Sequence, residues 1–124
     1  MPPFIVLTDQ ELTAMFDLSH LACRLYIILR ASMDTSTCIV GVINKISLHS
    51  LMADTEVNIP RGHGCQIIKQ TLKQIRIALD SLMRNSLIVK QGDAGMIFIL
   101  PMAFEAEDKA KKIRINAIES KNIV

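Results

Sequence analysis

Residues 71–101 read TLKQIRIALDSLMRNSLIVKQGDAGMIFILP, and this stretch decides the fold. Its first half has the period of a helix, because the apolar face falls at spacings of four, three and four, at Ile75, Leu79, Leu82 and Ser86. Thr71 suits the N-cap, where its hydroxyl accepts a hydrogen bond from an N–H group of the first turn. From residue 87 the pattern becomes LIVKQ, GDAG and MIFILP, which is typical of strand, turn and strand. The stretch predicts a helix of about four turns that leads into a short β-hairpin.

The other face of this helix is polar. We expect exposure at positions off the apolar stripe, namely Lys73, Gln74, Arg76, Asp80 and Arg84. Ile77 also lies off the stripe, beside basic residues. A β-branched apolar side chain at such an exposed position is expected to contact a binding partner. The polar face of this helix is therefore either a binding surface or an ordinary surface exposed to solvent.

Two patterns resemble a known superfamily. T-x-x-x-I-R-x-A-L-x-x-L-x-x-x-x-L-I, residues 71–88, resembles the third helix and first wing strand of the winged helix-turn-helix superfamily. Leu21-x3-Leu25-Tyr26-x2-Leu29-Arg30 resembles the first helix of such domains in replication initiators and regulators of plasmids, phages and other mobile elements. The resemblance implies an α+β, mainly α fold with a small antiparallel wing. It also implies binding of double-stranded DNA.

The segment before residue 55 supplies the other elements that such a fold needs. Helices are expected after good N-cap residues: Thr8 with Glu11 forms a capping box, and Ser19 and Ser47 open the next two helices. Residues 38–43 are apolar and β-branched, and Gly41 interrupts them, so we expect a turn or bulge inside a short strand region. The predicted elements are a helix at 8–16, a helix from 19 to about 31, a strand at 43–46 and a helix at 48–53.

Residues 55–70, TEVNIPRGHGCQIIKQ, form an unusually long connection between two helices of a helix-turn-helix. Pro60, Gly62 and Gly64 predict a loop over part of this stretch. Two interpretations stay open. Either the recognition helix begins as early as residue 65, or a basic loop carrying Arg61 and His63 lies beside its N-terminus.

The C-terminal residues 103–124 are predicted to form a solvated helix, an extension of the winged-helix domain at 1–102. Its thin apolar seam is Ala106, Ala110, Ile113 and Ala117. Acidic residues precede lysines by four positions in the pairs Glu105–Lys109, Glu107–Lys111 and Asp108–Lys112. This helix is expected either to pack back on the first helix of the domain or to pair with a second copy in a homodimer.

The amino-acid composition limits the classes of function that this chain can have. The chain has 124 residues, half of them hydrophobic, which is enough for one domain with a core. It lacks Trp and has few aromatic residues, so no platform for stacking single-stranded bases is evident. The net charge of +2 argues against a purely electrostatic DNA binder, but residues 45–91 carry seven basic and three acidic side chains. The positive charge is concentrated where the resemblance requires it.

Catalytic, metal and membrane functions have little support in the sequence. There is no P-loop, no G-x-S-x-G and no dinucleotide-binding turn, so we expect no enzyme activity and no cofactor. His20 and Cys23 share a helical face, but zinc needs more ligands, and we expect no metal site. Three cysteines without C-x-x-C spacing, no signal-peptide pattern and no apolar run of about 20 residues predict a cytoplasmic protein with no membrane partner.

The expected DNA contacts follow from the resemblance and from side-chain chemistry. On the recognition helix, Gln74 can read adenine, Lys73 and Arg76 can read guanine, and Ile77 can touch a thymine methyl. The acidic Asp93 at the wing tip would repel phosphate and shifts the expected specificity to the helix. The residues that we expect to contact DNA are Ser47, Arg61, His63, Lys69, Gln70, Thr71, Lys73, Gln74, Arg76, Ile77, Lys90 and Gln91.

The leading hypothesis is sequence-specific binding of double-stranded DNA, as a transcription regulator or as the DNA-binding module of a replication or maintenance system. As a dimer, the protein would read two half-sites about one helical turn apart. The alternative is a winged-helix module for protein–protein interaction in a larger assembly, which the modest net charge also suits.

Overall fold

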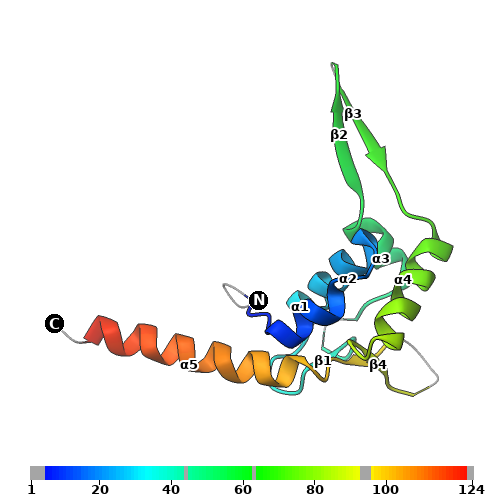
Figure 1. The fold of residues 1–124 in the computed structure, drawn as a ribbon. Helices are drawn as coiled ribbons and strands as arrows, with labels where there is room; N and C mark the ends of the chain where they lie inside the picture. The colour runs from blue at the N-terminus through cyan, green and yellow to red at the C-terminus, as the bar shows by residue number, and fades with distance from the viewer. Residues whose placement is uncertain (1–4, 44, 63, 93–95, 123–124) are drawn as a thin grey trace.

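The computed structural model describes residues 5–43, 45–62, 64–92 and 96–122, without the side chains of Arg61, Cys65 and residues 113–122. The described chain is α+β and mainly helical, as predicted, with small antiparallel sheets (Figure 1). Its elements in order are α1 (Asp9–Met15), α2 (His20–Ser32), β1 (Ile39–Val40), α3 (Leu48–Asp54), β2 (Val57–Arg61), β3 (Gly64–Ile68), α4 (Leu72–Arg84), β4 (Val89–Lys90), β5 (Phe98–Ile99) and α5 (Ala103–Asn122).

The first four helices begin where the sequence predicts. Thr8, Ser19, Ser47 and Thr71 each accept a hydrogen bond from a backbone N–H of the first turn. In α4 the bond is returned, because the backbone N–H of Thr71 donates to Oε1 of Gln74 over 2.8 Å. These caps satisfy N–H groups that a helix start leaves without a partner, and they set the first residue of each helix.

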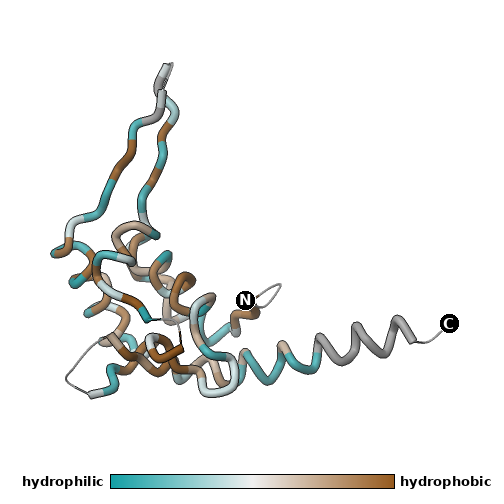
Figure 2. The backbone as a smooth tube through the Cα atoms, turned by 180° about the vertical axis from the view of Figure 1, so that it is seen from behind, coloured by the Kyte–Doolittle hydropathy of each residue, from teal (hydrophilic) through white to brown (hydrophobic). Residues whose placement is uncertain are grey.

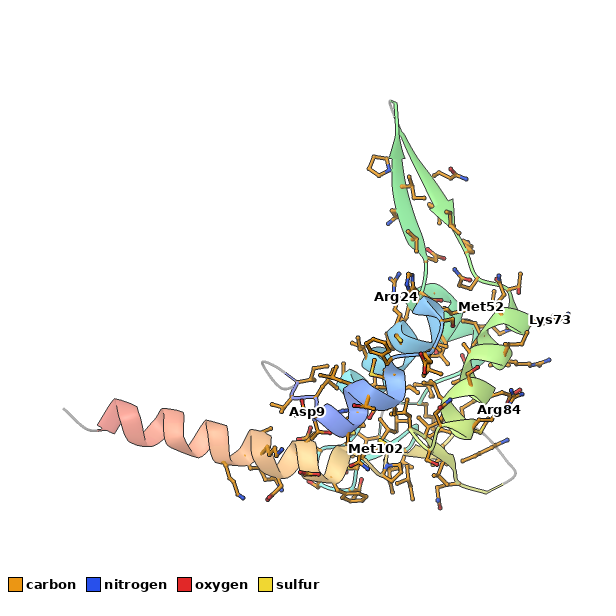
Figure 3. The ribbon with its side chains drawn as sticks, in the orientation of Figure 1. Asp9, Arg24, Met52, Lys73, Arg84 and Met102 are labelled. Atoms are coloured by element: carbon orange, nitrogen blue, oxygen red, sulfur yellow. The ribbon has the colours of Figure 1, made fainter. Side chains whose placement is uncertain are left out.

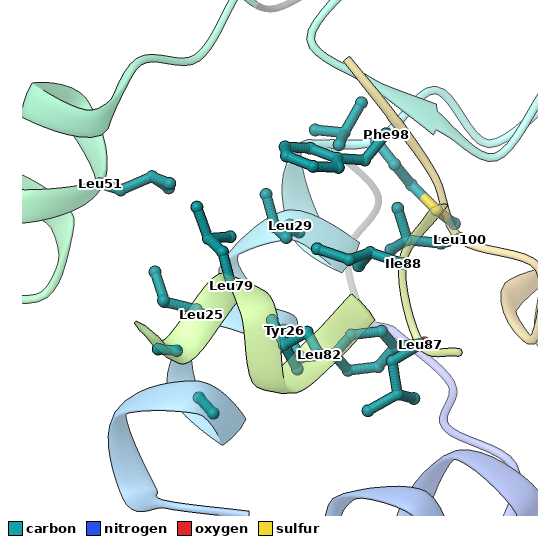
Figure 4. Packing of buried hydrophobic residues seen from close by; sticks show 14 of the residues in the cluster. Leu25, Tyr26, Leu29, Leu51, Leu79, Leu82, Leu87, Ile88, Phe98 and Leu100 are labelled. Atoms are coloured by element: carbon teal, nitrogen blue, oxygen red, sulfur yellow. The ribbon is translucent and has the colours of Figure 1, made fainter. Parts of the chain in front are cut away.

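The core forms where α2 crosses α4 and where both helices meet the ends of the strands (Figure 4). Leu25 and Leu29 of α2 and Leu82 of α4 are fully buried. The prediction that Ser86 continues the buried stripe is wrong. Ser86 is exposed in a left-handed conformation (φ 59°), because α4 ends at Arg84 and the chain reverses there.

A three-stranded sheet in the order β1-β5-β4 closes one end of the core. Ile39 pairs with Ile99, and Val89 pairs with the other side of Ile99. The strand predicted at 43–46 is wrong: β1 ends at Val40, because Gly41 takes φ 98° and turns the chain away. Asn44, within that predicted strand, lies outside the described residues.

A second hairpin, β2–β3, occupies most of residues 55–70 and projects away from the body (Figures 1 and 2). The interpretation with an early helix start at residue 65 is wrong, because α4 starts at Leu72 after the Thr71 cap. The other interpretation is correct about this start, but the connection is a paired ribbon rather than a loop. The register runs from Val57 opposite Ile68 to Arg61 opposite Gly64. The β-branched residues on both strands favour this ribbon, and Gly62, with φ 56°, allows the tight reversal.

A buried ionic cluster joins α1, α2 and α5. Arg30 lies at its centre, with Nε 3.0 Å from Oε2 of Glu11 and Nη1 3.1 Å from Oε1 of Glu107. The third guanidinium nitrogen, Nη2, donates to the carbonyl of Val6, and the Tyr26 hydroxyl donates to Glu11. The predicted pair Glu107–Lys111 is therefore wrong, because Glu107 points into the body instead of along the helix surface.

The start of α5 packs on the body, and the rest extends away from it (Figures 1 and 3). Ala106 and Ala110 are buried, as the seam predicted, whereas the side chains of Ile113 and Ala117 lie outside the described set. The other two predicted pairs form on the solvent side: Glu105–Lys109 at 3.4 Å and Asp108–Lys112 at 3.5 Å. The contact between Glu107 and α2 agrees with the expectation that this helix packs back on the domain.

Tyr26, the only tyrosine of the chain, should act as a reporter of alkaline unfolding. Burial, together with the hydrogen bond to Glu11, raises the pKa of Tyr26 well above its ordinary value. A raised native pKa gives stability that is complete below the unfolded pKa of about 10 and is lost at higher pH, by up to about 1.4 kcal/mol per pH unit. In a spectrophotometric titration, tyrosinate absorbance should therefore rise only with the loss of helical circular dichroism, and Tyr26→Phe should lessen the pH dependence. Tyrosinate formation in the folded protein near its ordinary pKa would contradict this prediction.

Candidate nucleic-acid interface

Helix α4 carries a basic face directly opposite its core face. Ile75, Ala78, Leu79 and Leu82 are buried against the body, where α4 contacts α2 and α3. The positions predicted to be exposed are exposed: Lys73, Gln74, Arg76, Asp80 and Arg84. Figure 3 shows Lys73 and Arg84 on the outer side of the helix, near its two ends. The basic face therefore runs along the whole of α4.

The cations of this face are available to a ligand. Within the described part of the chain, Lys73, Arg76, Arg84 and Lys90 form no ion pair. Ile77 stands among them with 56% of its surface exposed, although it is aliphatic. The surface thus combines free positive charge with an unburied apolar side chain.

Gln74 is less free than its exposure indicates. The side-chain Oε1 of Gln74 accepts a hydrogen bond from the backbone N–H of Thr71, and the backbone N–H of Gln74 donates to the Thr71 hydroxyl over 3.1 Å. A bidentate contact to adenine needs both the oxygen and the nitrogen of the amide. Gln74 must therefore leave the cap to read adenine in that way, whereas Lys73 and Arg76 can reach a ligand without breaking a bond.

A groove of about 280 Å³ lies beside this face, between α4 and the β4–β5 hairpin. Its apolar lining includes Leu79, Met96 and Phe98, while Arg76 and Lys90 bring positive charge to it from two different elements. Asp80 also lines the groove and lowers the local positive potential. The structure thus brings together two cations that are 14 residues apart in the sequence.

The remaining residues of the predicted set are distributed around α4. Ser47 is exposed at the start of α3, where it caps the helix through Ser50. Lys90 and Gln91 are exposed at the end of β4, and the backbone N–H of Gln91 donates to Ile97 over 2.8 Å. Asp93 and His63 lie outside the described residues, as does the side chain of Arg61.

The base of the β2–β3 hairpin is tied to the body. Lys69 lies 3.6 Å from Glu56 in an ion pair open to solvent, so its charge is partly compensated. Arg24 donates through Nη2 to the backbone carbonyls of Asp54 (3.3 Å) and Glu56 (3.2 Å). Gln70 is half-buried in a small pocket that Arg24 also lines. No sequence pattern predicts the Arg24 contact, because its acceptors are backbone atoms of a distant segment.

The histidine and cysteine side chains that the structure describes do not cluster into a site. Within those ranges no three His, Cys, Asp or Glu side chains are grouped as a metal site. Cys23 donates its thiol to the carbonyl of Met15, and Cys38 is a buried free thiol. Nor does any helix of the described ranges combine the length and apolar character needed to cross a bilayer.

Comparisons with known proteins identify no relative of this chain. No family model fits the sequence, and no curated protein or solved structure is significantly similar to the chain.

Proposed function

We propose that this protein binds double-stranded DNA, with α4 as the recognition helix of a winged helix-turn-helix. The observation that carries the proposal is the basic outer face of α4, which lies between two hairpins and on which Lys73 and Arg76 form no ion pair with any residue that the structure describes. A helix of this kind fits the major groove, where Arg and Lys recognise guanine.

The order and pairing of the elements support this assignment. α2, β1, α3, α4 and the β4–β5 hairpin follow one another as three helices, a small strand and a wing would. The pairing of β1 with β5 attaches the small strand to that hairpin. The additional feature is the β2–β3 hairpin, which is inserted into the turn between the second and third helices of this scheme.

The individual side chains take different roles in the proposed complex. Lys73, Arg76 and Ile77 lie near the N-terminal half of α4 and face the bases, whereas Arg84, Lys90 and the α3 cap at Ser47 meet the phosphate backbone. About five phosphate contacts give a log–log salt slope of roughly −4 to −5. The protein then acts by occupying a site, either as a transcription regulator or in a replication or maintenance system. Dimerisation through the outer part of α5 would bring two recognition helices to a palindromic site.

A second candidate function is supported by Ile77. Its exposed aliphatic surface, on a chain with a net charge of only +2, also suits a helix that docks on another protein. The two functions differ in salt dependence, because only the DNA complex releases counterions from a polyanion.

Changing Lys73→Ala together with Arg76→Ala should weaken duplex binding by at least about tenfold. On a mixed-sequence duplex, which offers no specific site, both cations contact phosphates, so the change should also reduce the salt slope by about 1.8. Both side chains are exposed and form no ion pair with the described residues, so the melting temperature should stay nearly unchanged. Binding is measured by gel shift or fluorescence anisotropy on a mixed-sequence duplex at about 50 mM salt, followed by a salt series.

The matched control is Lys109→Ala with Lys112→Ala, which removes the same charge from the solvent side of α5. It should leave both affinity and salt slope close to those of the unchanged protein. If the unchanged protein binds no duplex at tens of micromolar and about 50 mM salt, DNA binding is wrong and the protein-interaction function replaces it. Equal loss in both double variants would mean that total charge, and not the α4 face, governs binding.

A further inference from the structure

The β2–β3 hairpin extends outside the core that holds the domain together. It stands away from the helices as a two-stranded ribbon (Figures 1 and 2). Among the described side chains of residues 57–68, none is buried. A free two-stranded ribbon is marginally stable in water, so a ribbon kept without a covering layer points to an external partner.

The register of the ribbon decides which side chains share a face. Asn58 lies opposite Ile67, and Pro60 lies opposite Cys65, so Asn58, Pro60 and Ile67 belong to one face. Ile67 is 55% exposed and Pro60 is also exposed. This face, which we call the Pro60–Ile67 face, presents Pro60 near the tip of the ribbon and Ile67 near its base, with the amide of Asn58 opposite Ile67.

The ribbon has a fixed base next to the proposed recognition helix. Arg24 donates hydrogen bonds to the backbone carbonyls of Asp54 and Glu56. Figure 3 shows Arg24 where the hairpin leaves the body. At the other strand, Lys69 and Gln70 alone separate β3 from Thr71, the N-cap of α4. A molecule that lies on α4 is therefore within reach of the ribbon.

Charge identifies the class of partner. No acidic residue occurs from residue 57 to residue 79, while Arg61, Lys69, Lys73 and Arg76 are basic. An acid-free stretch that spans both the ribbon and the first half of α4 complements one polyanion that touches both. β-Ribbons bind DNA in the major groove or in the minor groove, and in the minor groove inserted apolar side chains kink the duplex.

We propose that the β2–β3 hairpin is a second DNA-binding element, which enters the minor groove next to the major-groove site of α4 and bends the duplex. This proposal rests on the proposed function. Pro60 and Ile67 act as an apolar wedge that partly unstacks a base step, as apolar side chains do in minor-groove architectural proteins. Asn58, on the same face, is placed to reach the acceptors at the floor of that groove.

The test measures bending separately from binding. A mixed-sequence duplex about two helical turns long carries a donor dye at one end and an acceptor dye at the other. Binding of the unchanged protein should raise energy transfer. Pro60→Ala with Ile67→Ser should lower that rise by at least about half while the affinity changes by less than about threefold, because α4 still supplies the main contacts. Circular dichroism melting checks that both proteins are folded.

The matched control is Ile68→Ser, an isoleucine that the register places on the opposite face. It should keep the full rise in energy transfer. A minor-groove ligand of the netropsin type, bound to A·T tracts in the same duplex, should suppress bending by the unchanged protein.

Two results would overturn the proposal while leaving DNA binding by α4 intact. One is an undiminished rise in energy transfer for the wedge variant. The other is a dimer in sedimentation that Ile67→Ser dissociates without any effect on bending, which would show that a second copy covers the face. Failure of the unchanged protein to bind duplex at all would instead remove the proposed function itself, and this proposal with it.

Discussion

Arg30→Ala should lower the free energy of unfolding by about 3–5 kcal/mol, a large part of the total for a domain of this size. Arg30 is fully buried and its three nitrogens serve Glu11, Glu107 and the carbonyl of Val6. Alanine would leave two buried carboxylates without a cation and would open a cavity between α1, α2 and α5. Chemical denaturation followed by circular dichroism measures the loss.

The same cluster offers its own controls. Lys109→Ala removes a cation from a solvent-exposed pair on α5 and should change stability by less than about 1 kcal/mol. Arg30→Met combined with Glu11→Gln and Glu107→Gln replaces the ions by groups of similar volume, and should recover part of the stability that Arg30→Ala loses. An Arg30→Ala protein as stable as the unchanged one would mean that α5 does not dock through Glu107 in solution.

Local patterns were sufficient to predict the helices. A cap depends on residues three positions apart, and the apolar period of α4 depends on its own turns, so Thr71 and the stripe through Ile75 could be read directly. The same period predicted that Lys73 and Arg76 are exposed. The T-x-x-Q pattern of Thr71 and Gln74 also predicts the capping role of Gln74, which competes with the expected contact to adenine.

Contacts between distant residues could not be predicted in the same way. Glu107 has Lys111 one turn away in the sequence, yet its partner is Arg30, 77 residues away, because α5 returns to the body. In the β2–β3 hairpin the alternation of Val57 and Ile59 was available as a strand signal. Pro60 and the nearby glycines predict a loop instead, but proline is compatible with a ribbon that has free edges.

The position of β1 depends on one glycine and on a segment far along the chain. Gly41 has φ 98°, and a Cβ atom there would lie 2.0 Å from the backbone oxygen of Met96. The two segments approach this closely because Val40 pairs with Phe98. Only a residue without a side chain permits both the turn after β1 and the contact with the β4–β5 hairpin, the wing of the proposed DNA complex.

Gly41→Ala should therefore lower the free energy of unfolding by about 3–5 kcal/mol, because it adds backbone strain at positive φ to a clash with a backbone atom that cannot rotate away. Gly92→Ala is the matched control: its φ is 71°, but no described residue lies within 4 Å of the added Cβ, so only the strain of about 1–2 kcal/mol applies. Denaturation curves of the two variants separate the clash from the strain. Equal losses would mean that β1 and the segment before β5 are not in close contact.

At temperatures where Gly41→Ala remains folded, its duplex affinity should also fall, because a displaced β4–β5 hairpin moves Lys90 away from Arg76. Gly92→Ala should keep these two cations together and should therefore keep the affinity.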